Sequence, residues 1–330
     1  MKVTKDQKDA LNIALNLEIE EADYAEKVRK KLAERRRNAD FKGFRKGMVP
    51  PAMIRRVYGE QCLVDSVNEL IGESIDSFIR DEKLNIIGEP LPAENQPENE
   101  WKEGNTFHFT FDLGLYPEFK VEAGSGDEIP HYQISMSAKD KSGMVESLKK
   151  YYGEKKEEKS DEDIDKEVTD RLHEQYRQEA DWRLNQDIRG YFIDKAAIEL
   201  PEDFLKRWLF AANDGKYTKE DIEKEFDAFK KDFCWQLVRG EFLRNFGIKI
   251  GDKDIDEAVR AYVTYQYAMY GMGNVPADII ENSMNQIRGD RRQMDRILEQ
   301  VEDEKVLAKL KETVTIKAKK ISAEKFRELK

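Results

Sequence analysis

The chain has 330 residues, of which 38% are charged and 39% hydrophobic, with a formal net charge of −11 and a mean hydropathy of −0.80. It has no run of about eighteen apolar residues and no signal-peptide core in residues 1–9, which excludes a membrane span and favours a soluble, cytoplasmic protein of two or three domains. Cys62 and Cys234 lie far apart without metal-ligand spacing, which argues against a disulfide framework or a zinc site.

The first 116 residues are predicted to form a small α+β domain, with helices over an antiparallel sheet. Apolar and polar residues alternate with a period of two in the predicted strands, which lie at residues 11–19, 85–91 and 106–115. A helix with one apolar face follows from about Asp23. A second helical region occupies residues 53–79, and we expect Gly59 to break it near its start.

Residues 27–56 are strongly basic in an otherwise acidic chain. Twelve bases against Glu34 and Asp40 give this stretch a net charge of +10, which favours contact with a polyanion. Its centre is the sequence Gly-Phe-Arg-Lys-Gly-Met-Val-Pro at 43–50, whose glycines allow a tight loop that exposes an aromatic ring and two cations. The alternative is a solvated basic helix followed by an ordinary turn.

The middle of the chain, residues 117–163, is predicted to be an extended linker, a short helix and a charged hinge. The short amphipathic helix ends at Gly153. From Glu154 to Glu167, eight acids stand against four lysines, and the first half of this run contains no apolar residue. Such a composition indicates an exposed hinge.

Residues 164–330 have a helical pattern almost throughout. Apolar residues recur at three- and four-residue spacing around 222–238 and again around 294–310. Several of the predicted helices run beyond twenty residues. We therefore expect a mostly α-helical domain with projecting helical arms.

A run rich in tyrosine and methionine lies near the end of one of these helices. Such side chains adapt to varied apolar partners. Our candidates for contact with unfolded polypeptides are Tyr265, Met269, Tyr270 and Met272. The alternative is that they pack one helix against another.

No residue pattern in this chain indicates catalysis. His108, His131 and His173 have no neighbouring Ser, Cys or carboxylate in a catalytic spacing. No Gly-rich phosphate loop is present, and paired acids carry little information in a chain this charged. The sequence therefore points to binding, without a metal or a cofactor.

The basic loop, set between two helices of a small α+β domain, resembles the ribosome-docking loop of trigger factor, a family of bacterial nascent-chain chaperones. Other stretches resemble that family's amino-terminal domain and, more loosely, its helical chaperone domain. The amino-terminal stretches are Asp40–Arg45, Val57–Gly59, Ile86–Pro90 and Tyr116–Phe119, and the carboxy-terminal ones are Ile198–Pro201, Gly240–Arg244 and Val306–Leu310.

The resemblance implies an ATP-independent chaperone that docks at the ribosomal exit tunnel and shields unfolded or nascent polypeptides. Its partners at the exit would be ribosomal protein and RNA, and it allows a homodimer off the ribosome. The implied docking residues are Gly43, Phe44, Arg45, Lys46, Gly47 and Pro50, supplemented by Lys42, Arg55 and Arg56. The alternative is a free cytoplasmic holdase or assembly factor with weak or no ribosome binding.

One departure from the family concerns a prolyl isomerase domain of the FK506-binding type. The family usually carries it between the two parts that resemble this chain. Here about ten charged residues stand at that place, too few to fold alone. We therefore expect no isomerase activity and do not expect an enzyme.

Overall fold

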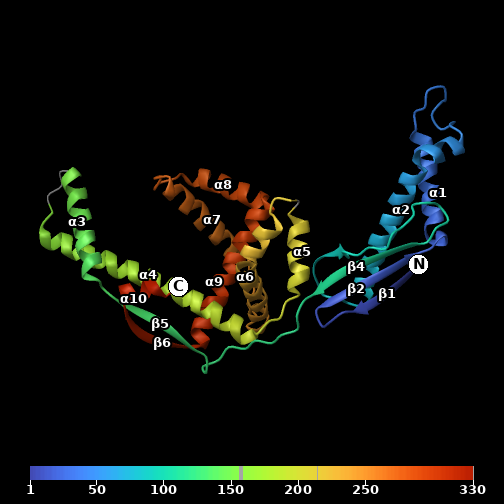
Figure 1. The fold of residues 1–330 in the computed structure, drawn as a ribbon. Helices are drawn as coiled ribbons and strands as arrows, with labels where there is room; N and C mark the ends of the chain where they lie inside the picture. The colour runs from blue at the N-terminus through green and yellow to red at the C-terminus, as the bar shows by residue number, and fades with distance from the viewer. Residues whose placement is uncertain (156–158, 214, 330) are drawn as a thin grey trace. The chain divides into compact units, whose positions relative to one another are not determined.

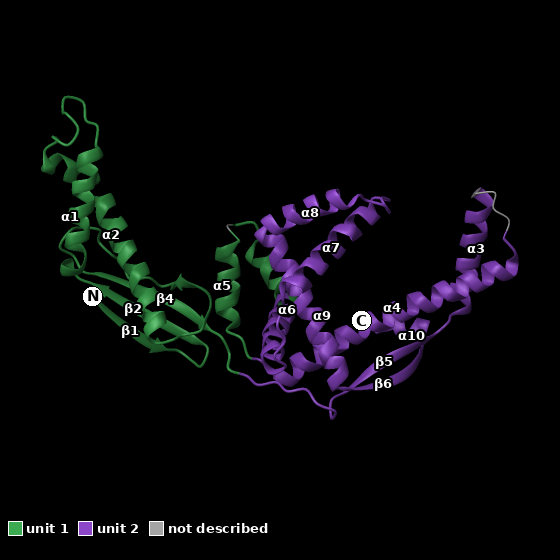
Figure 2. Cartoon of the chain, turned by 180° about the vertical axis from the view of Figure 1, so that it is seen from behind, with its two compact units in different colours: residues 1–118, 199–228 green, residues 119–198, 229–330 purple. Residues whose placement is uncertain are grey.

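The computed structural model describes residues 1–155, 159–213 and 215–329 (Figure 1). The chain forms two compact units, one made of residues 1–118 and 199–228 and the other of residues 119–198 and 229–330 (Figure 2). Each unit is therefore built from two separate stretches of chain. Residues 199–228, which the sequence pattern groups with the helical half, belong to the first unit.

A four-stranded antiparallel sheet in the order β1-β2-β4-β3 is the base of the first unit. Its strands are β1 (Lys2–Gln7), β2 (Asn12–Ile19), β3 (Ile86–Pro92) and β4 (Phe107–Leu115). The predicted alternation sets the register, because the apolar residues of β2 stand opposite those of β4, as in Leu15 with Phe111 and Leu17 with Phe109. The sequence does not predict β1, since almost all of its side chains are polar and exposed.

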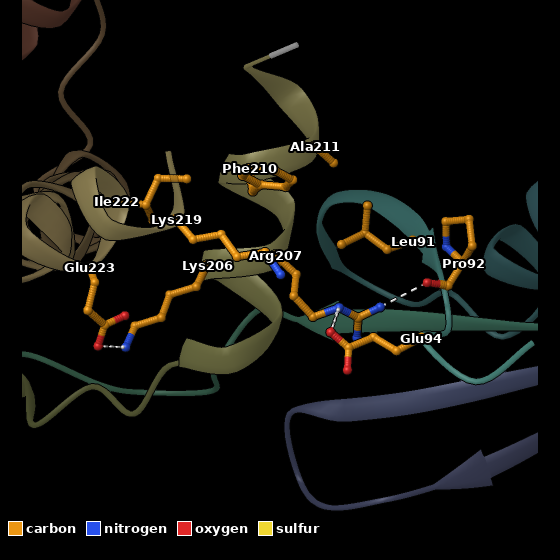
Figure 3. A pocket seen from close by; sticks show the side chains of 10 residues that line it. All are labelled: Leu91, Pro92, Glu94, Lys206, Arg207, Phe210, Ala211, Lys219, Ile222 and Glu223. Atoms are coloured by element: carbon orange, nitrogen blue, oxygen red, sulfur yellow. Dashed lines mark hydrogen bonds and ion pairs between the residues drawn. The ribbon is translucent and has the colours of Figure 1, made fainter. Parts of the chain in front are cut away.

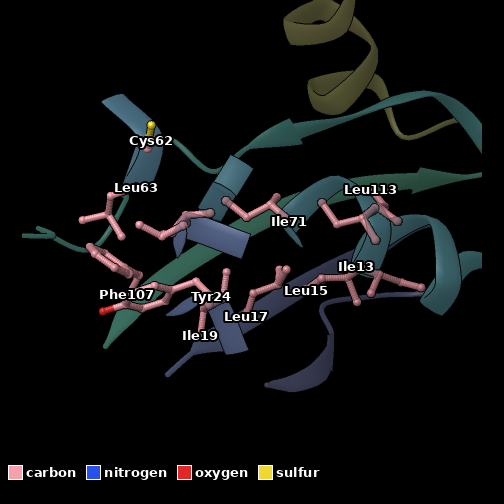
Figure 4. Close-up of a cluster of buried hydrophobic side chains, with 13 residues drawn as sticks. Ile13, Leu15, Leu17, Ile19, Tyr24, Cys62, Leu63, Ile71, Phe107 and Leu113 are labelled. Carbon is pink, nitrogen blue, oxygen red and sulfur yellow. The ribbon is translucent and has the colours of Figure 1, made fainter. Parts of the chain in front are cut away.

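Two helices, α1 (Glu21–Asn38) and α2 (Pro51–Asp81), cover one face of this sheet. Tyr24 and Val28 of α1 join the apolar face of α2 and the inward residues of β2 and β4 in a single core (Figure 4). The expected break at Gly59 is wrong, because α2 continues through this buried glycine. A glycine inside a helix costs only about 1 kcal/mol, which the buried apolar face of a 31-residue helix readily offsets.

At the opposite face of the sheet, α5 (Glu202–Ala212), from the second stretch of the unit, packs against one end of β3 and β4. The ring of Phe204 lies against Gly114 of β4, and the indole of Trp208 lies against Gly88 of β3. Arg207 of α5 donates to Asp112 Oδ2 at 2.7 Å.

Asp112 also accepts from Lys8 Nζ at 2.7 Å, so this buried carboxylate is held between two cations. Burial favours its protonation, but the contacts with Lys8 and Arg207 outweigh burial and lower the pKa of Asp112. The carboxylate therefore stays ionised at neutral pH and ties β4 to α5.

The second unit is organised along one long helix, α4 (Asp161–Ala196). Every fourth residue of α4 from Ile164 to Ala196 is buried. Two parallel strands, β5 (Glu128–Ser135) and β6 (Thr315–Ser322), form a small second sheet, and β5 packs against α4. The helical pattern predicted up to the last residue is therefore interrupted at β6.

The remaining helices surround three separate small cores rather than one. The first lies where α3 (Ala138–Lys155) and α10 (Ala323–Glu328) meet the start of α4. The second joins the end of α4 to α6 (Lys219–Asn245) and to the end of α9 (Arg291–Thr313). The third holds together α7 (Asp252–Met269), α8 (Ala277–Gly289) and the first half of α9.

The predicted fold class, an α+β part followed by a mostly helical part, is confirmed. Within the second unit, α3 and the α7–α8 pair each extend from the body as an arm (Figure 2). Residues 156–158 of the expected charged hinge lie outside the described residues. No helix in the described ranges is long and apolar enough to cross a bilayer.

Candidate functional site

The loop between α1 and α2 consists of two consecutive tight turns. Phe44 N–H donates to the carbonyl of Phe41 at 3.0 Å, and Met48 N–H donates to that of Arg45 at 2.9 Å. The third residue of each turn is a glycine with positive φ, Gly43 at 95° and Gly47 at 82°. Because other residues adopt this backbone conformation only with strain, both glycines are required for the loop shape that the sequence predicts.

The loop rests on a small core of its own. Val49 is fully buried, Ile54 is 1% exposed, and both pack with Ala39. Arg36 Nε donates to the carbonyl oxygen of Val49 at 2.8 Å, which fixes the last part of the loop against α1. Pro50 caps the amino terminus of α2, as the prolines at this point predict. The loop is therefore a folded element rather than a loose connection.

The side chains that this core leaves outside are those expected to make contacts. Phe44, Arg45 and Lys46 are all exposed, with 40% of the surface of Phe44 accessible. Lys42 and Arg56 are exposed on either side of them. The structure thus brings together on one loop and the adjoining helix start the residues proposed for docking.

The cations of the basic stretch differ in how far they are neutralised. On α1, Lys27 and Lys31 lie 3.1 and 2.9 Å from the carboxylate of Glu69, and their contacts lower the pKa of Glu69, with Lys31 contributing first. Near the loop, Arg55 pairs with Glu103 at 3.0 Å. Within the described ranges, no ion pair is found for Lys42, Arg45, Lys46 or Arg56. The loop therefore keeps its positive charge uncompensated, next to the end of α1, where Arg35, Arg36 and Arg37 also lack an ion pair among the described residues.

The four tyrosines and methionines proposed for client contact lie at the carboxy-terminal end of α7 and in the turn after it. Their exposed fractions are 64% for Tyr265, 70% for Met269, 81% for Tyr270 and 52% for Met272. The packing of α7 on α8 is made by other residues, including Val263, which is 2% exposed. The four residues therefore take little part in the packing of α7 on α8, and client contact stays a prediction for them.

Two family models cover most of this chain. The model described as "Bacterial trigger factor protein (TF)" matches residues 1–148, which include the sheet, the two helices and the loop. The model described as "Probable trigger factor, C-terminal domain" matches residues 180–330. The chain belongs to the trigger factor family. The resemblance inferred from the loop and its flanking motifs is thereby confirmed.

Curated trigger factors match only part of this chain. The trigger factor of Francisella tularensis subsp. novicida (strain U112) is 29% identical over 152 residues, which are 46% of this chain and 34% of that protein. The trigger factor of Geobacter sp. (strain M21) is 33% identical over 129 residues, or 39% of this chain and 29% of the relative. The matched segment thus spans about a third of the length of these relatives.

A solved structure has the same fold over almost the whole chain. It comes from work on promiscuous substrate recognition in folding and assembly activities of the trigger factor chaperone. The two share a TM-score of 0.55 and 11% sequence identity, over 94% of this chain and 99% of the other. At this identity the likeness shows the trigger factor fold and nothing finer.

The first unit also contains a pocket of about 400 Å³ that the sequence does not signal (Figure 3). It lies between the end of β3 and the helices α5 and α6, with an apolar lining that includes Leu91, Phe210 and Ile222. Two lysines stand at its side: Lys206 Nζ pairs with Glu223 at 2.8 Å, and Lys219 Nζ lies 5.5 Å from the centre of the Phe210 ring. Such a pocket suits an apolar side chain, and the charge of Lys206 is balanced by Glu223.

Proposed function

We propose that this chain is an ATP-independent chaperone of the cytoplasm that docks at the ribosomal exit through the α1–α2 loop and shields emerging polypeptides. The single observation that supports docking most directly is the loop itself. It presents Phe44 with the unpaired cations Arg45 and Lys46 on a buried base, in the domain that matches the amino-terminal trigger factor model. Exposed cations on a rigid support suit the phosphates of RNA beside a protein surface.

Shielding of clients is supported by the second unit. Its arms have small cores of their own, and the end of α7 together with the turn after it exposes four large adaptable side chains. Exposed apolar groups of this kind on a soluble protein mark interaction sites. Their chemistry suits unfolded segments of many sequences rather than one partner of fixed shape.

Co-sedimentation with ribosomes at two salt concentrations tests the docking proposal. Replacing Phe44, Arg45 and Lys46 together with alanine is expected to abolish co-sedimentation and leave the circular dichroism spectrum unchanged. The three side chains are exposed, and surface substitutions usually change stability by no more than about 0.5 kcal/mol. Binding of the unchanged protein should also weaken steeply as salt rises.

A matched control removes one aromatic ring and two cations elsewhere in the first unit. Lys216, Tyr217 and Lys224 are all exposed, and their triple alanine variant should bind ribosomes as the unchanged protein does. Equal co-sedimentation of the loop variant and this control would contradict the docking assignment. If the unchanged protein itself fails to co-sediment, the alternative of a free cytoplasmic holdase or assembly factor is favoured instead. Sedimentation of the chain alone would test the expected homodimer.

A further inference from the structure

The pocket at the end of β3 is built from two stretches of chain that lie far apart in the sequence. Leu91 and Pro92 of β3 stand on one side of it, and Phe210 of α5 and Ile222 of α6 stand on the other (Figure 3). Leu91 and Ile222 are buried, whereas 39% of the surface of Phe210 is accessible. The pocket therefore has an apolar floor and an aromatic ring that a ligand can reach.

Contacts within the first unit hold the walls of this pocket in place before any ligand binds. Arg207 donates to Asp112 Oδ2 at 2.7 Å and to the carbonyl oxygen of Pro92 at 2.8 Å, which ties α5 to the end of β3. Lys206 Nζ pairs with Glu223 at 2.8 Å, which ties α5 to α6. Because the walls are already ordered, little conformational entropy is lost on binding, which favours affinity.

Lys219 is the cation of the pocket that remains available to a ligand. Its ammonium group lies 5.5 Å from the centre of the Phe210 ring, and no ion pair is found for it in the part of the chain that the structure describes. The other two cations of the lining, Lys206 and Arg207, are both engaged by carboxylates. The pocket thus offers an apolar surface beside one uncompensated positive charge.

The size and the rim of the pocket indicate what kind of ligand fits. A volume of about 400 Å³ is at the lower end of the range for ligand sites, so it suits one or two side chains better than a large cofactor. At the rim, the side chains of Glu94 and Glu223 are 72% and 66% exposed, so a chain can pass over the opening while one side chain enters. A nucleobase would leave polar groups without partners on the apolar floor, which costs free energy.

We propose that this pocket binds a segment of an unfolded polypeptide in which an apolar side chain is followed by an acidic one. The apolar side chain fills the space between Leu91, Phe210 and Ile222, and the carboxylate pairs with Lys219. The inference rests on the proposed chaperone function. It adds a client site in the first unit that has a preference for sequence, separate from the residues at the end of α7.

Two labelled peptides test this preference by fluorescence anisotropy at low salt. One contains a single phenylalanine followed by an aspartate in a run of serines and glycines, and the other has a lysine in place of the aspartate. We expect the unchanged protein to bind the first peptide about fivefold more tightly than the second, as one partly exposed ion pair allows. Lys219→Glu should reverse this order, because a carboxylate at this position repels the aspartate and attracts the lysine.

Two further variants separate the pocket from general charge effects. Lys224→Glu is the matched control, since Lys224 is exposed on the same helix and does not line the pocket, and it should keep the preference of the unchanged protein. Ala211→Phe places a ring in the pocket from an exposed position on α5 and should abolish binding of both peptides. Circular dichroism and the melting temperature verify that each variant folds.

Equal binding of the two peptides, or a folded Lys219→Glu variant that keeps the original order, would overturn the inference. Binding of decanoate but of neither peptide would overturn it as well and assign the pocket to a fatty acid. Suppression of aggregation of an unfolded protein is measured in parallel with the unchanged protein. If aggregation is suppressed without any peptide preference, this inference is wrong and the chaperone proposal stands. If aggregation is not suppressed, the chaperone proposal is refuted, and with it the assignment of the pocket to clients.

Discussion

Two glycines decide how closely α5 approaches the sheet of the first unit. A Cβ atom added at Gly114 would lie 2.5 Å from a carbon of the Phe204 ring, and one at Gly88 would lie 2.4 Å from the indole nitrogen of Trp208. Such separations are far shorter than van der Waals contact. The absence of a side chain at these positions is therefore a packing requirement, which the sequence pattern alone does not reveal.

Gly114→Ala is expected to destabilise the protein by about 1–3 kcal/mol, because Phe204 must move out of its packed position. Its matched control is Gly72→Ala in α2, where nothing lies within 4 Å of the added Cβ. That change should instead stabilise the protein by about 0.4–1 kcal/mol, as alanine is the better helix former. Chemical denaturation of both variants, followed by fluorescence, checks the two signs. Equal effects would contradict the close packing of α5.

At the scale of elements, buried contacts override local sequence signals such as a glycine inside a helix. Gly59 signals a helix end, yet α2 runs from Pro51 to Asp81 because its buried face continues on both sides. The end of α7 shows the reverse: Tyr265 and Met269 continue a helical apolar pattern but face outward. Helical periodicity therefore predicts the helix and not which partner each face meets.

Changing Tyr265, Met269, Tyr270 and Met272 to serine should weaken suppression of aggregation of an unfolded protein and leave the melting temperature nearly unchanged. All four side chains are more than half exposed, so their removal costs little packing. Val263→Ala on the buried face of α7 is the contrasting control and should lower the melting temperature. If the serine variant melts several degrees early, these residues are core residues and the client assignment is wrong, since truncating buried large side chains costs about 2–5 kcal/mol each.

For the molecule as a whole, the two family matches leave residues 149–179 between them. This interval contains the end of α3 and the first part of α4, which pack together through Leu148, Tyr152, Ile164 and Val168. The contact is reinforced where the Tyr152 hydroxyl donates to Glu167 Oε2 at 2.9 Å. The interval that neither family model matches therefore belongs to two helices that bury each other's apolar faces.

We expect the purified chain not to accelerate cis–trans isomerisation of an X-Pro bond in a tetrapeptide. An isomerase must lower a barrier of about 18–20 kcal/mol, which calls for an apolar site that excludes water. The pair of α3 and α4 uses its apolar side chains on itself. A coupled proteolysis assay with an authentic isomerase as positive control measures this directly. Acceleration that survives repurification would show that the chain contains an isomerase site.

The sequence by itself determined much of the first unit and its loop. The period-two runs gave β2, β3 and β4 within one or two residues, because a half-buried strand requires alternation. Charge reversal and paired glycines located the loop, since both are local properties of a few consecutive residues. The order of an α+β part and a helical part followed from the same local periodicities.

Only the tertiary structure decided which distant segments meet. β1 and β6 are polar strands whose pairing partners supply the stability that their own side chains lack, and β6 pairs with a strand 187 positions earlier, Glu128 standing opposite Thr315. The assignment of α5 to the first unit likewise depends on Gly114, Gly88 and Asp112, whose partners Phe204, Trp208 and Arg207 no local pattern identifies. The sequence shows where the cations are, but the fold decides which of them meet a carboxylate. Lys27 and Lys31 are neutralised because α2 passes beside α1 and brings Glu69 to them, whereas the loop cations lie beyond this contact.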